Sequence, residues 1–304
     1  MIAKFYQKAN IFLKVNSRAK INIIVNTKSL HRSSKSLQTL AIAILYLCFY
    51  FFSFFIMDVI SIAQFDMVYN AFSFAIAGMG AATLFLWLER SQLAPQYRTA
   101  LTISGLVTAI ATYHYVRIFN SWDGAYEVVG NTISITGQAF NHAYRYVDWL
   151  LTVPLLLVEL ILVMGLSRKE TYSKSLWFGV MAALMVILGY PGETAIDMST
   201  KLLWWTLGMI PFVYLVYQLF VGLSASIKSQ PAEIKSLIVT ARWIIVATWC
   251  FYPVVYVLPL LGFEGSSAMV AVQVGYTIAD LLAKAVFGIY IYFIAVRKSE
   301  SVKA

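Results

Sequence analysis

Long apolar segments follow one another along this chain, separated by short polar connections. Seven of them, at about residues 66–89, 98–119, 143–166, 175–192, 201–223, 234–260 and 268–296, are long enough to cross a bilayer as helices of roughly 20 residues. Their hydrophobicity is continuous, whereas the strands of a membrane β-barrel alternate every second residue. The pattern therefore predicts an all-α membrane protein built as a bundle of seven transmembrane helices.

Turn residues stand in the connections between these segments. They are Ala94-Pro95, Asp123-Gly124, Gly130-Asn131, Pro191-Gly192 and Gln230-Pro231. We expect the helices to end at or near these positions, so that the seven segments form one domain over residues 64–297, followed by a short cytoplasmic tail at residues 298–304.

The composition agrees with an integral membrane protein. Hydrophobic residues make up 60% of the chain and charged residues 12%, whereas charged residues form about a quarter of an ordinary soluble domain. The two cysteines, Cys48 and Cys250, both lie in apolar segments, and their number and placement suit neither a disulfide framework nor a metal site. We expect both to serve in packing.

The net charge of +9 is distributed unevenly along the chain. Basic residues flank alternate ends of the segments, namely Arg90, Arg98, Arg168, Lys169, Lys174, Lys228, Lys235, Arg242, Arg297, Lys298 and Lys303. The opposite ends carry little beyond Arg117 and Lys201. This asymmetry follows the positive-inside rule and predicts a multi-pass protein of the cell (inner or plasma) membrane with a cytoplasmic C-terminus. Nucleic acid is not needed to explain the charge.

Residues 1–63 form a basic arm followed by a hydrophobic segment. Residues 1–36 contain eight Lys or Arg and no acid, and the stretch from Gln38 to Met57 has no charge. Three interpretations stay open: a secretory signal read at Ser61-Ile62-Ala63, a retained eighth helix, and a start at Met57. We expect this region to be removed from or absent in the mature protein, because no functional argument uses it.

Lys284 is the one lysine in the middle of a long apolar segment, and Asp280 precedes it by one helical turn. Ionisable residues at bilayer depth are costly and usually mark a transport pathway or a ligand counter-ion. A desolvated lysine amine also suits Schiff-base formation with a carbonyl ligand. The alternative is a structural ion pair that joins two helices.

The third segment carries a second polar face. Six of its residues share one side of a helix: Arg145, Asp148, Trp149, Thr152, Leu156 and Glu159. Asp148 and Glu159 are separated by roughly 16 Å along the axis, which is too far for a catalytic carboxylate pair. They suit two stations on one proton path, with Glu159 on the cytoplasmic side. The alternative is that each acid only pairs with a neighbouring helix.

The sequence of these two segments resembles that of the microbial (type 1) rhodopsins, and within them the proteorhodopsin and xanthorhodopsin group of outward proton pumps. The resemblance rests on Arg145-Tyr-Val-Asp148-Trp149-Leu-Leu-Thr152-Val-Pro154-Leu-Leu-Leu-Val-Glu159 together with Asp280-Leu-Leu-Ala-Lys284, and it extends from about Gln64 to Arg297. It implies a light-driven pump rather than an enzyme, with all-trans retinal as cofactor, protons as the transported ion and a homo-oligomeric assembly in the bilayer.

The resemblance also implies roles for individual residues. Lys284 would bind retinal as a protonated Schiff base. Asp148 would be the primary counter-ion and proton acceptor, and Asp280 the second counter-ion. Thr152 and Glu159 complete an Asp-Thr-Glu triplet in which Glu159 is the cytoplasmic proton donor, Arg145 tunes the outer half-channel, and His114 contacts Asp148. The retinal pocket would include Trp149, Leu156, Trp205, Trp249, Tyr252, Pro253 and Tyr256, although such residues taken alone are more often ordinary core packing.

Other functions can be distinguished from that of a proton pump by sequence and by experiment. Sensory photoreceptors of this family usually lack a carboxylic donor where Glu159 stands, and chloride or sodium pumps differ at Asp148 or Thr152. A seven-helix receptor or scaffold without a chromophore would need no Lys284, and it would give no visible band after addition of retinal.

Two positions in the pocket carry finer expectations. A leucine at position 156 goes with green absorption in the proteorhodopsin group, so we expect a green-absorbing pigment. Members with a carotenoid antenna carry glycine where this chain has Trp205, so we expect no antenna, with Gly208 as the alternative opening if the alignment shifts by three residues.

Overall fold

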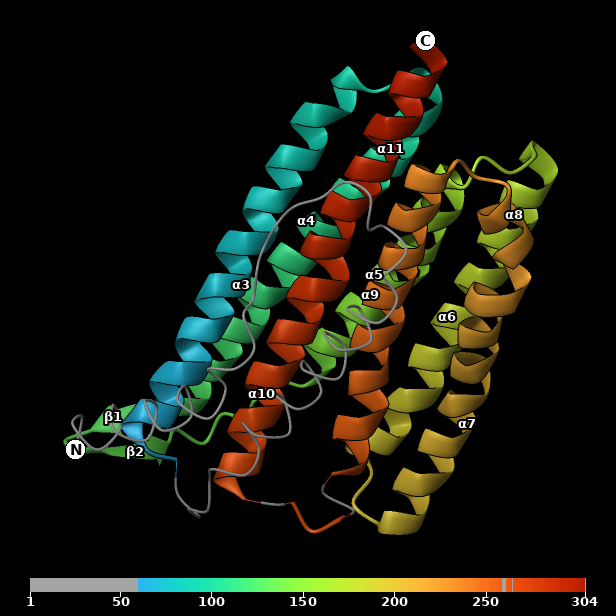
Figure 1. Cartoon of the computed structure of the whole chain (residues 1–304). Helices are drawn as coiled ribbons and strands as arrows, with labels where there is room; N and C mark the ends of the chain where they lie inside the picture. The colour runs from blue at the N-terminus through green and yellow to red at the C-terminus, as the bar shows by residue number, and fades with distance from the viewer. Residues whose placement is uncertain (1–59, 259–260, 264, 304) are drawn as a thin grey trace, which may run out of the picture. The chain divides into compact units, whose positions relative to one another are not determined.

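The structure is a computed structural model that describes residues 60–258, 261–263 and 265–303. The basic arm and the hydrophobic segment from Gln38 to Met57 lie outside the described residues. In the described part, consecutive helices lie side by side and run alternately up and down (Figure 1).

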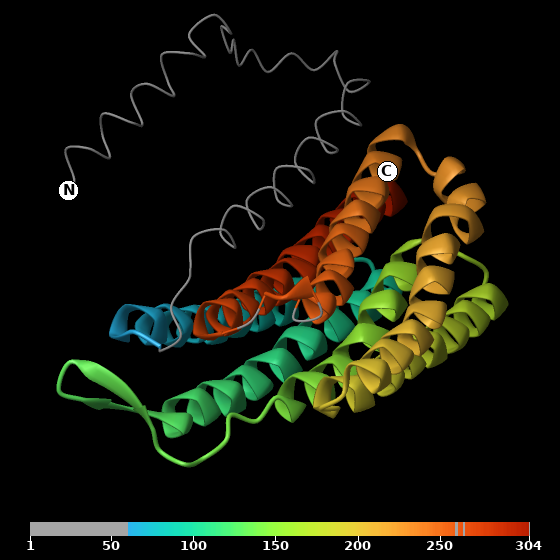
Figure 2. The ribbon, with the colours of Figure 1, turned by 90° about the horizontal axis from the view of Figure 1, so that it is seen from below.

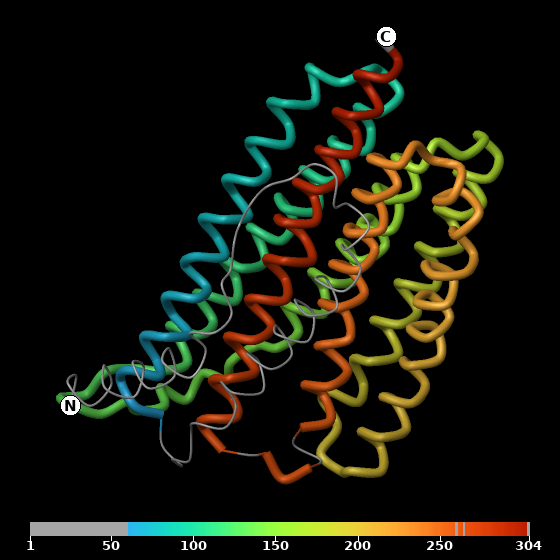
Figure 3. Tube along the Cα trace, viewed as in Figure 1, coloured from blue at the N-terminus to red at the C-terminus, as the bar shows by residue number. Residues whose placement is uncertain are grey.

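The long helices are α3 (Ile62–Glu89), α4 (Pro95–Ala125), α5 (Ala143–Val163), α6 (Arg168–Thr194), α7 (Met198–Tyr217), α9 (Ala232–Val257), α10 (Ser266–Asp280) and α11 (Phe287–Lys303). Shorter helical pieces are η2 (Arg90–Gln92), η3 (Gln218–Gly222), α8 (Ser224–Lys228) and η5 (Leu281–Val286). The helices α10, η5 and α11 form one continuous rod, which Figure 3 shows in red. The predicted seven-helix bundle is confirmed.

The bundle is closed by its last rod. Each of α3 to α7 packs against the helix that follows it, while α10 contacts α3 and α11 contacts α4, α5 and α9. Figure 2 shows the bundle from below, with α3 (blue) beside the rod of α10 and α11 (red). The rod that carries Lys284 therefore faces α5, the helix of the polar third segment.

Within the described residues, six helices are long and apolar enough to cross a membrane. The remaining helix of the bundle, α4, has 31 residues but a more polar composition, because it buries Ser104, Thr108 and His114 toward the interior. It packs between α3 and α5, and its axis lies along that of the bundle. The polar residues on its inner face thus lower the mean hydropathy of α4, although α4 belongs to the same bundle.

The helices α4 and α6 end one and two residues beyond the turn residues that were predicted to end them. α4 continues through Asp123-Gly124 to Ala125, and α6 continues through Pro191-Gly192 to Thr194. Trp122, which is fully buried, anchors the last turn of α4, and Thr136 donates hydrogen bonds to main-chain carbonyls at its end. Tertiary contacts thus extend α4 past a weak breaking signal.

The connection after α4 contains the only sheet in the described residues. β1 (Tyr126–Val129) pairs antiparallel with β2 (Thr132–Ile135), and the turn between them is at Gly130-Asn131, as predicted. Gly130 has a φ of 63°, which glycine adopts without strain. This hairpin lies at the end of the bundle opposite the C-terminus (Figure 1).

The start of α3 uses the residues that also resemble a signal-peptidase site. The Ser61 hydroxyl accepts a hydrogen bond from the Gln64 main-chain N–H, and the Gln64 side chain accepts one from the Ser61 N–H. This capping box satisfies two main-chain donors that a helix otherwise leaves free. Cleavage after Ala63 would remove the cap.

Candidate functional site

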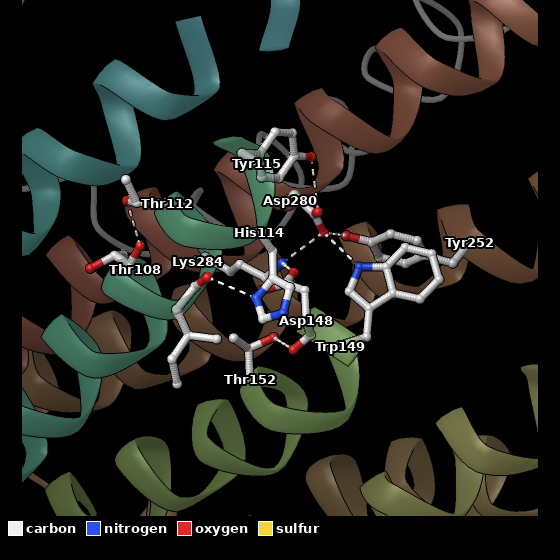
Figure 4. Close-up of polar contacts among 11 residues, drawn as sticks. Thr108, Thr112, His114, Tyr115, Asp148, Trp149, Thr152, Tyr252, Asp280 and Lys284 are labelled. Atoms are coloured by element: carbon white, nitrogen blue, oxygen red, sulfur yellow. Dashed lines mark hydrogen bonds and ion pairs between the residues drawn. The ribbon is translucent and has the colours of Figure 1, made fainter. Parts of the chain in front are cut away.

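Lys284 lies in the middle of the bundle between two carboxylates. Its Nζ donates a hydrogen bond to Asp148 Oδ2 on α5 and lies 3.1 Å from Asp280 Oδ1, one turn earlier on its own rod. All three residues are at most 2% exposed. A buried ammonium held by two carboxylates satisfies the requirement that buried charges be paired (Figure 4).

The two carboxylates have different surroundings. Asp280 accepts hydrogen bonds from Tyr252 OH at 2.5 Å, Tyr115 OH at 2.9 Å and Trp149 Nε1 at 3.2 Å. Asp148 Oδ1 is sealed from solvent and has no hydrogen-bond partner among the described residues. Asp280 is therefore a saturated acceptor, whereas Asp148 keeps an unused oxygen beside the ammonium.

Lys284 occupies a π-helical segment, η5, in which the backbone hydrogen bonds skip one residue further than in an α-helix. Such segments are rare and often occur at functional sites. η5 rests against α3, α4 and α9. The spacing of Asp280 and Lys284 was readable from the sequence, but this local widening of the helix was not.

His114 and Thr152 approach Asp148 without bonding its carboxylate. His114 Nδ1 is 3.9 Å from Asp148 Oδ1 and 3.0 Å from the Ile110 carbonyl oxygen. Thr152 Oγ1 donates to the Asp148 main-chain carbonyl at 2.8 Å. Both side chains border Asp148, and Thr152 fixes its backbone (Figure 4).

Arg145 lies on the same helix as Asp148, toward the end that holds the β-hairpin. Its Nη1 donates to Gln273 Oε1 at 2.8 Å, and its guanidinium stacks over the rings of Phe72 and Tyr276. Its Nε and Nη2 are buried without a hydrogen-bond partner among the described residues. Two donors of this arginine are thus available for another acceptor.

Glu159 lies far along α5 from Asp148 and is completely buried. Neither carboxyl oxygen has a hydrogen bond of normal geometry, and Ser104 on α4 is its polar neighbour. A buried carboxyl group without a counter-charge is far cheaper in its neutral form. The site therefore suits a carboxylic acid that holds a proton at rest.

A cavity begins at Lys284 and has mostly aromatic and apolar walls. Its free space is about 800 Å³ including the part open to solvent. All the residues predicted for the pocket line it: Trp149, Leu156, Trp205, Trp249, Tyr252, Pro253 and Tyr256. An elongated apolar aldehyde joined to the Lys284 amine fits a cavity of this chemistry.

Several residues of the site escaped the sequence analysis. The cavity is also lined by Gly208, which the sequence analysis named only as an alternative opening, and by Tyr146, Val153, Met185, Val186, Gly189, Met209, Phe212, Tyr276 and Ala283, which it did not name. Gln273 and Tyr276 precede Lys284 by eleven and eight residues, so helical spacing places them near the face of Lys284 and would have flagged them. Met185 and Gly189 carry no polar or spacing signal.

Trp205 spans from α7 to α9. Its Nε1 donates a hydrogen bond of 3.1 Å to the Pro253 carbonyl, and its ring lines the cavity. Gly208 also lines the cavity but lies against α6, because a methyl group built on it would meet the Met185 carbonyl oxygen at 3.5 Å and the Gly189 nitrogen at 3.6 Å. The indole therefore occupies the space between α7 and α9.

Comparison with known proteins gives the class of the chain. The family model for bacteriorhodopsin-like proteins matches residues 67–298. This chain belongs to the bacteriorhodopsin-like family, the microbial (type 1) rhodopsins.

Individual relatives show which members of this family the chain is similar to. A blue-light absorbing proteorhodopsin of the gamma-proteobacterium Hot 75m4 is 33% identical over 240 residues, which cover 78% of this chain and 89% of the relative. A green-light absorbing proteorhodopsin of the gamma-proteobacterium EBAC31A08 is 32% identical over 233 residues, or 76% and 87%. The crystal structure of xanthorhodopsin, called a light-driven ion pump with dual chromophore, is 46% identical with a TM-score of 0.78 and covers 81% of this chain and 98% of its own.

Proposed function

We propose that this protein is a light-driven outward proton pump that binds all-trans retinal at Lys284. The observation that carries the proposal is the Lys284 ammonium, held between Asp148 and Asp280 at the wall of an aromatic cavity. The names of the proteorhodopsins and of the xanthorhodopsin ion pump support the same class of activity. The chain moves a proton and makes no lasting bond in a substrate, so we do not regard it as an enzyme.

Retinal, attached as a protonated Schiff base to Lys284 Nζ, supplies light absorption and a light-driven change of shape. The protein supplies the proton positions. Asp148 takes the proton from Lys284 Nζ, because its Oδ1 is unbonded and sealed while Asp280 is occupied by three other donors. Asp280 holds the nitrogen in place through its own ion pair with Lys284.

Glu159 gives the transfer its direction. It lies on the same helix as Asp148, on the side of Lys284 that we assign to the cytoplasm from the basic residues at that end. Its sealed carboxyl group returns a proton to Lys284 Nζ after Asp148 has been loaded. Arg145, on the opposite side of Asp148, supplies free donors toward the outer half of the path.

A sensory photoreceptor would use the same chromophore site. The sealed acid at Glu159 favours the pump, because a sensor needs no rapid resupply of the proton from the cytoplasm. We also propose that retinal is the only chromophore here. The dual chromophore named for xanthorhodopsin is a property of that protein, and Trp205 occupies the space between α7 and α9 in this chain.

The deciding experiment is pH recording of illuminated cells that produce the protein with retinal. Illumination should acidify the medium, and a protonophore should abolish the change. Lys284→Ala cells serve as the matched control. A coloured protein that gives no pH change in light would support the sensor and contradict the pump.

A further inference from the structure

Lys298 is a second buried lysine, five residues before the end of α11. The sequence places it among the basic residues that flank a membrane helix, but the structure buries it to 6% exposure. Its Nζ lies over the Tyr97 ring at the start of α4, 6.0 Å from the centroid. A methyl group built at Gly165, just after α5, would lie 3.2 Å from that nitrogen.

No carboxylate contacts Lys298 among the described residues. The acids nearby in sequence and space are taken by Arg297, which pairs with Glu233 on α9 and with Glu300 on the exposed surface. Arg98 on α4 donates to the main-chain carbonyls of Leu93 and Ser91. Lys298 is therefore not one half of a structural ion pair in this part of the protein.

The end of α5 does not depend on Lys298 either. Met164 is the C-cap residue of α5, and its carbonyl oxygen accepts a hydrogen bond of 2.9 Å from Gln230 Nε2. No hydrogen bond from Lys298 Nζ to a carbonyl is present in the described residues, and the nitrogen is not among their sealed polar atoms. The amine thus borders solvent from an otherwise buried position.

The three helices that meet at Lys298 also enclose Glu159. Glu159 lies on α5, about 9 Å before Gly165 along the axis, and its neighbour Ser104 lies on α4. Gly288 on α11 permits close packing there, since a methyl group built on it would lie 3.6 Å from Ser104 Cβ. Glu159 and Lys298 therefore lie at two different levels of the region where α4, α5 and α11 meet.

An apolar layer separates the two groups. Leu101 lies between Tyr97 and Ser104 along α4, and Ile291, Ile294 and Ala295 lie between Gly288 and Lys298 along α11. Each of these four is at most 1% exposed. In this structure these side chains separate the lysine amine from the glutamate carboxyl group.

We propose that Lys298 is the proton-entry residue for Glu159. This inference rests on the proposed function, in which Glu159 becomes a carboxylate once in each cycle. An N–H bond of the Lys298 ammonium then breaks, water that enters between the helices relays the proton, an O–H bond forms on Glu159, and the neutral amine regains a proton from cytoplasmic water. Lysine can release its proton in this way, whereas arginine stays protonated in proteins.

The test follows the lifetime of ionised Glu159 by time-resolved infrared difference spectroscopy on the retinal-loaded full chain, together with proton uptake reported by a pH-sensitive dye. Glu159→Gln assigns the carboxyl band. Lys298→Met and Lys298→Arg are the test variants, and Arg297→Gln removes one positive charge from the neighbouring position as a control.

We expect both Lys298 variants to prolong the ionised state and delay proton uptake by roughly 10-fold or more, as for the loss of a positioned proton carrier, and Arg297→Gln to match the unmodified protein. Lys298→Arg keeps the approximate length and the charge of the side chain, so it tests the proposal even if Lys298→Met fails to fold. Normal uptake in Lys298→Arg would show that charge alone suffices and would overturn the proposal. If Glu159→Gln itself recovers at normal speed, the donor role of Glu159 fails, which is a separate result from normal Lys298 variants beside a slow Glu159→Gln.

Discussion

Asp148 and Asp280 contact the same Lys284 ammonium from two different helices, but only Asp280 is held by additional side-chain donors. Tyr115, Trp149 and Tyr252 donate hydrogen bonds to Asp280, while Asp148 presents an unbonded oxygen. This asymmetry assigns different tasks to two chemically identical groups.

Lys284→Ala should give a protein without visible absorption after addition of retinal. Lys284 is the only lysine among the described residues that line the cavity, so its removal takes away the amine that we expect to form the link. Absorption spectra of the purified variant measure this, with Lys235→Ala, an exposed lysine on α9, as the coloured control. A coloured Lys284→Ala protein would refute the attachment site.

Asp148→Asn should shift absorption to the red and stop pumping. The change removes a negative charge beside the positive nitrogen, so the ground state loses stabilisation that the excited state needs less, and it also removes the proton acceptor. The absorption maximum and the light-induced pH change are the measurements. Transport at the original rate in this variant would exclude Asp148 from the role.

Glu159→Gln should leave retinal binding and colour intact and slow the return of the proton to Lys284 by roughly 100-fold, a usual loss for a missing general acid. Glutamine matches the size of glutamate but cannot supply the proton. Flash spectroscopy of the recovery measures this, and added azide, a small diffusible acid, should partly restore the speed. Recovery at the original speed without azide would contradict the assignment.

Leu156 is completely buried and lines the cavity one turn beyond Thr152. We predict green absorption for the unmodified protein and a blue shift for Leu156→Gln, because a polar group beside the polyene changes the relative energies of its ground and excited charge distributions. Spectra at neutral pH decide this. Blue absorption of the unmodified protein would show that other residues determine the colour.

Trp205→Gly should open the space between α7 and α9, since it removes the indole that bonds the Pro253 carbonyl. Purification with a hydroxylated carotenoid followed by an excitation spectrum should show energy transfer in this variant and none in the unmodified protein. Gly208→Ala is a matched change on the same helix that faces α6 and should not create the effect. Energy transfer in the unmodified protein would show that the opening exists despite Trp205.

The sequence by itself determined the seven apolar helices and the residues that share each helical face. Asp280 with Lys284, and Asp148 with Glu159, are separated by whole numbers of turns, and helical periodicity is a local property that needs no knowledge of neighbours. The turns at Ala94-Pro95 and Gln230-Pro231 were readable for the same reason, because proline restricts its own residue and the one before it.

The tertiary structure alone decided which faces meet and where buried groups find partners. Lys284 pairs with Asp148 across 136 positions of sequence, and Tyr115 reaches Asp280 across 165. It also carried α4 past Asp123-Gly124 and buried Lys298, which its sequence position marked as a flanking charge. Packing between helices is non-local and outweighs weak local preferences, since burying Trp122 gains more free energy than continuing a helix through one glycine costs.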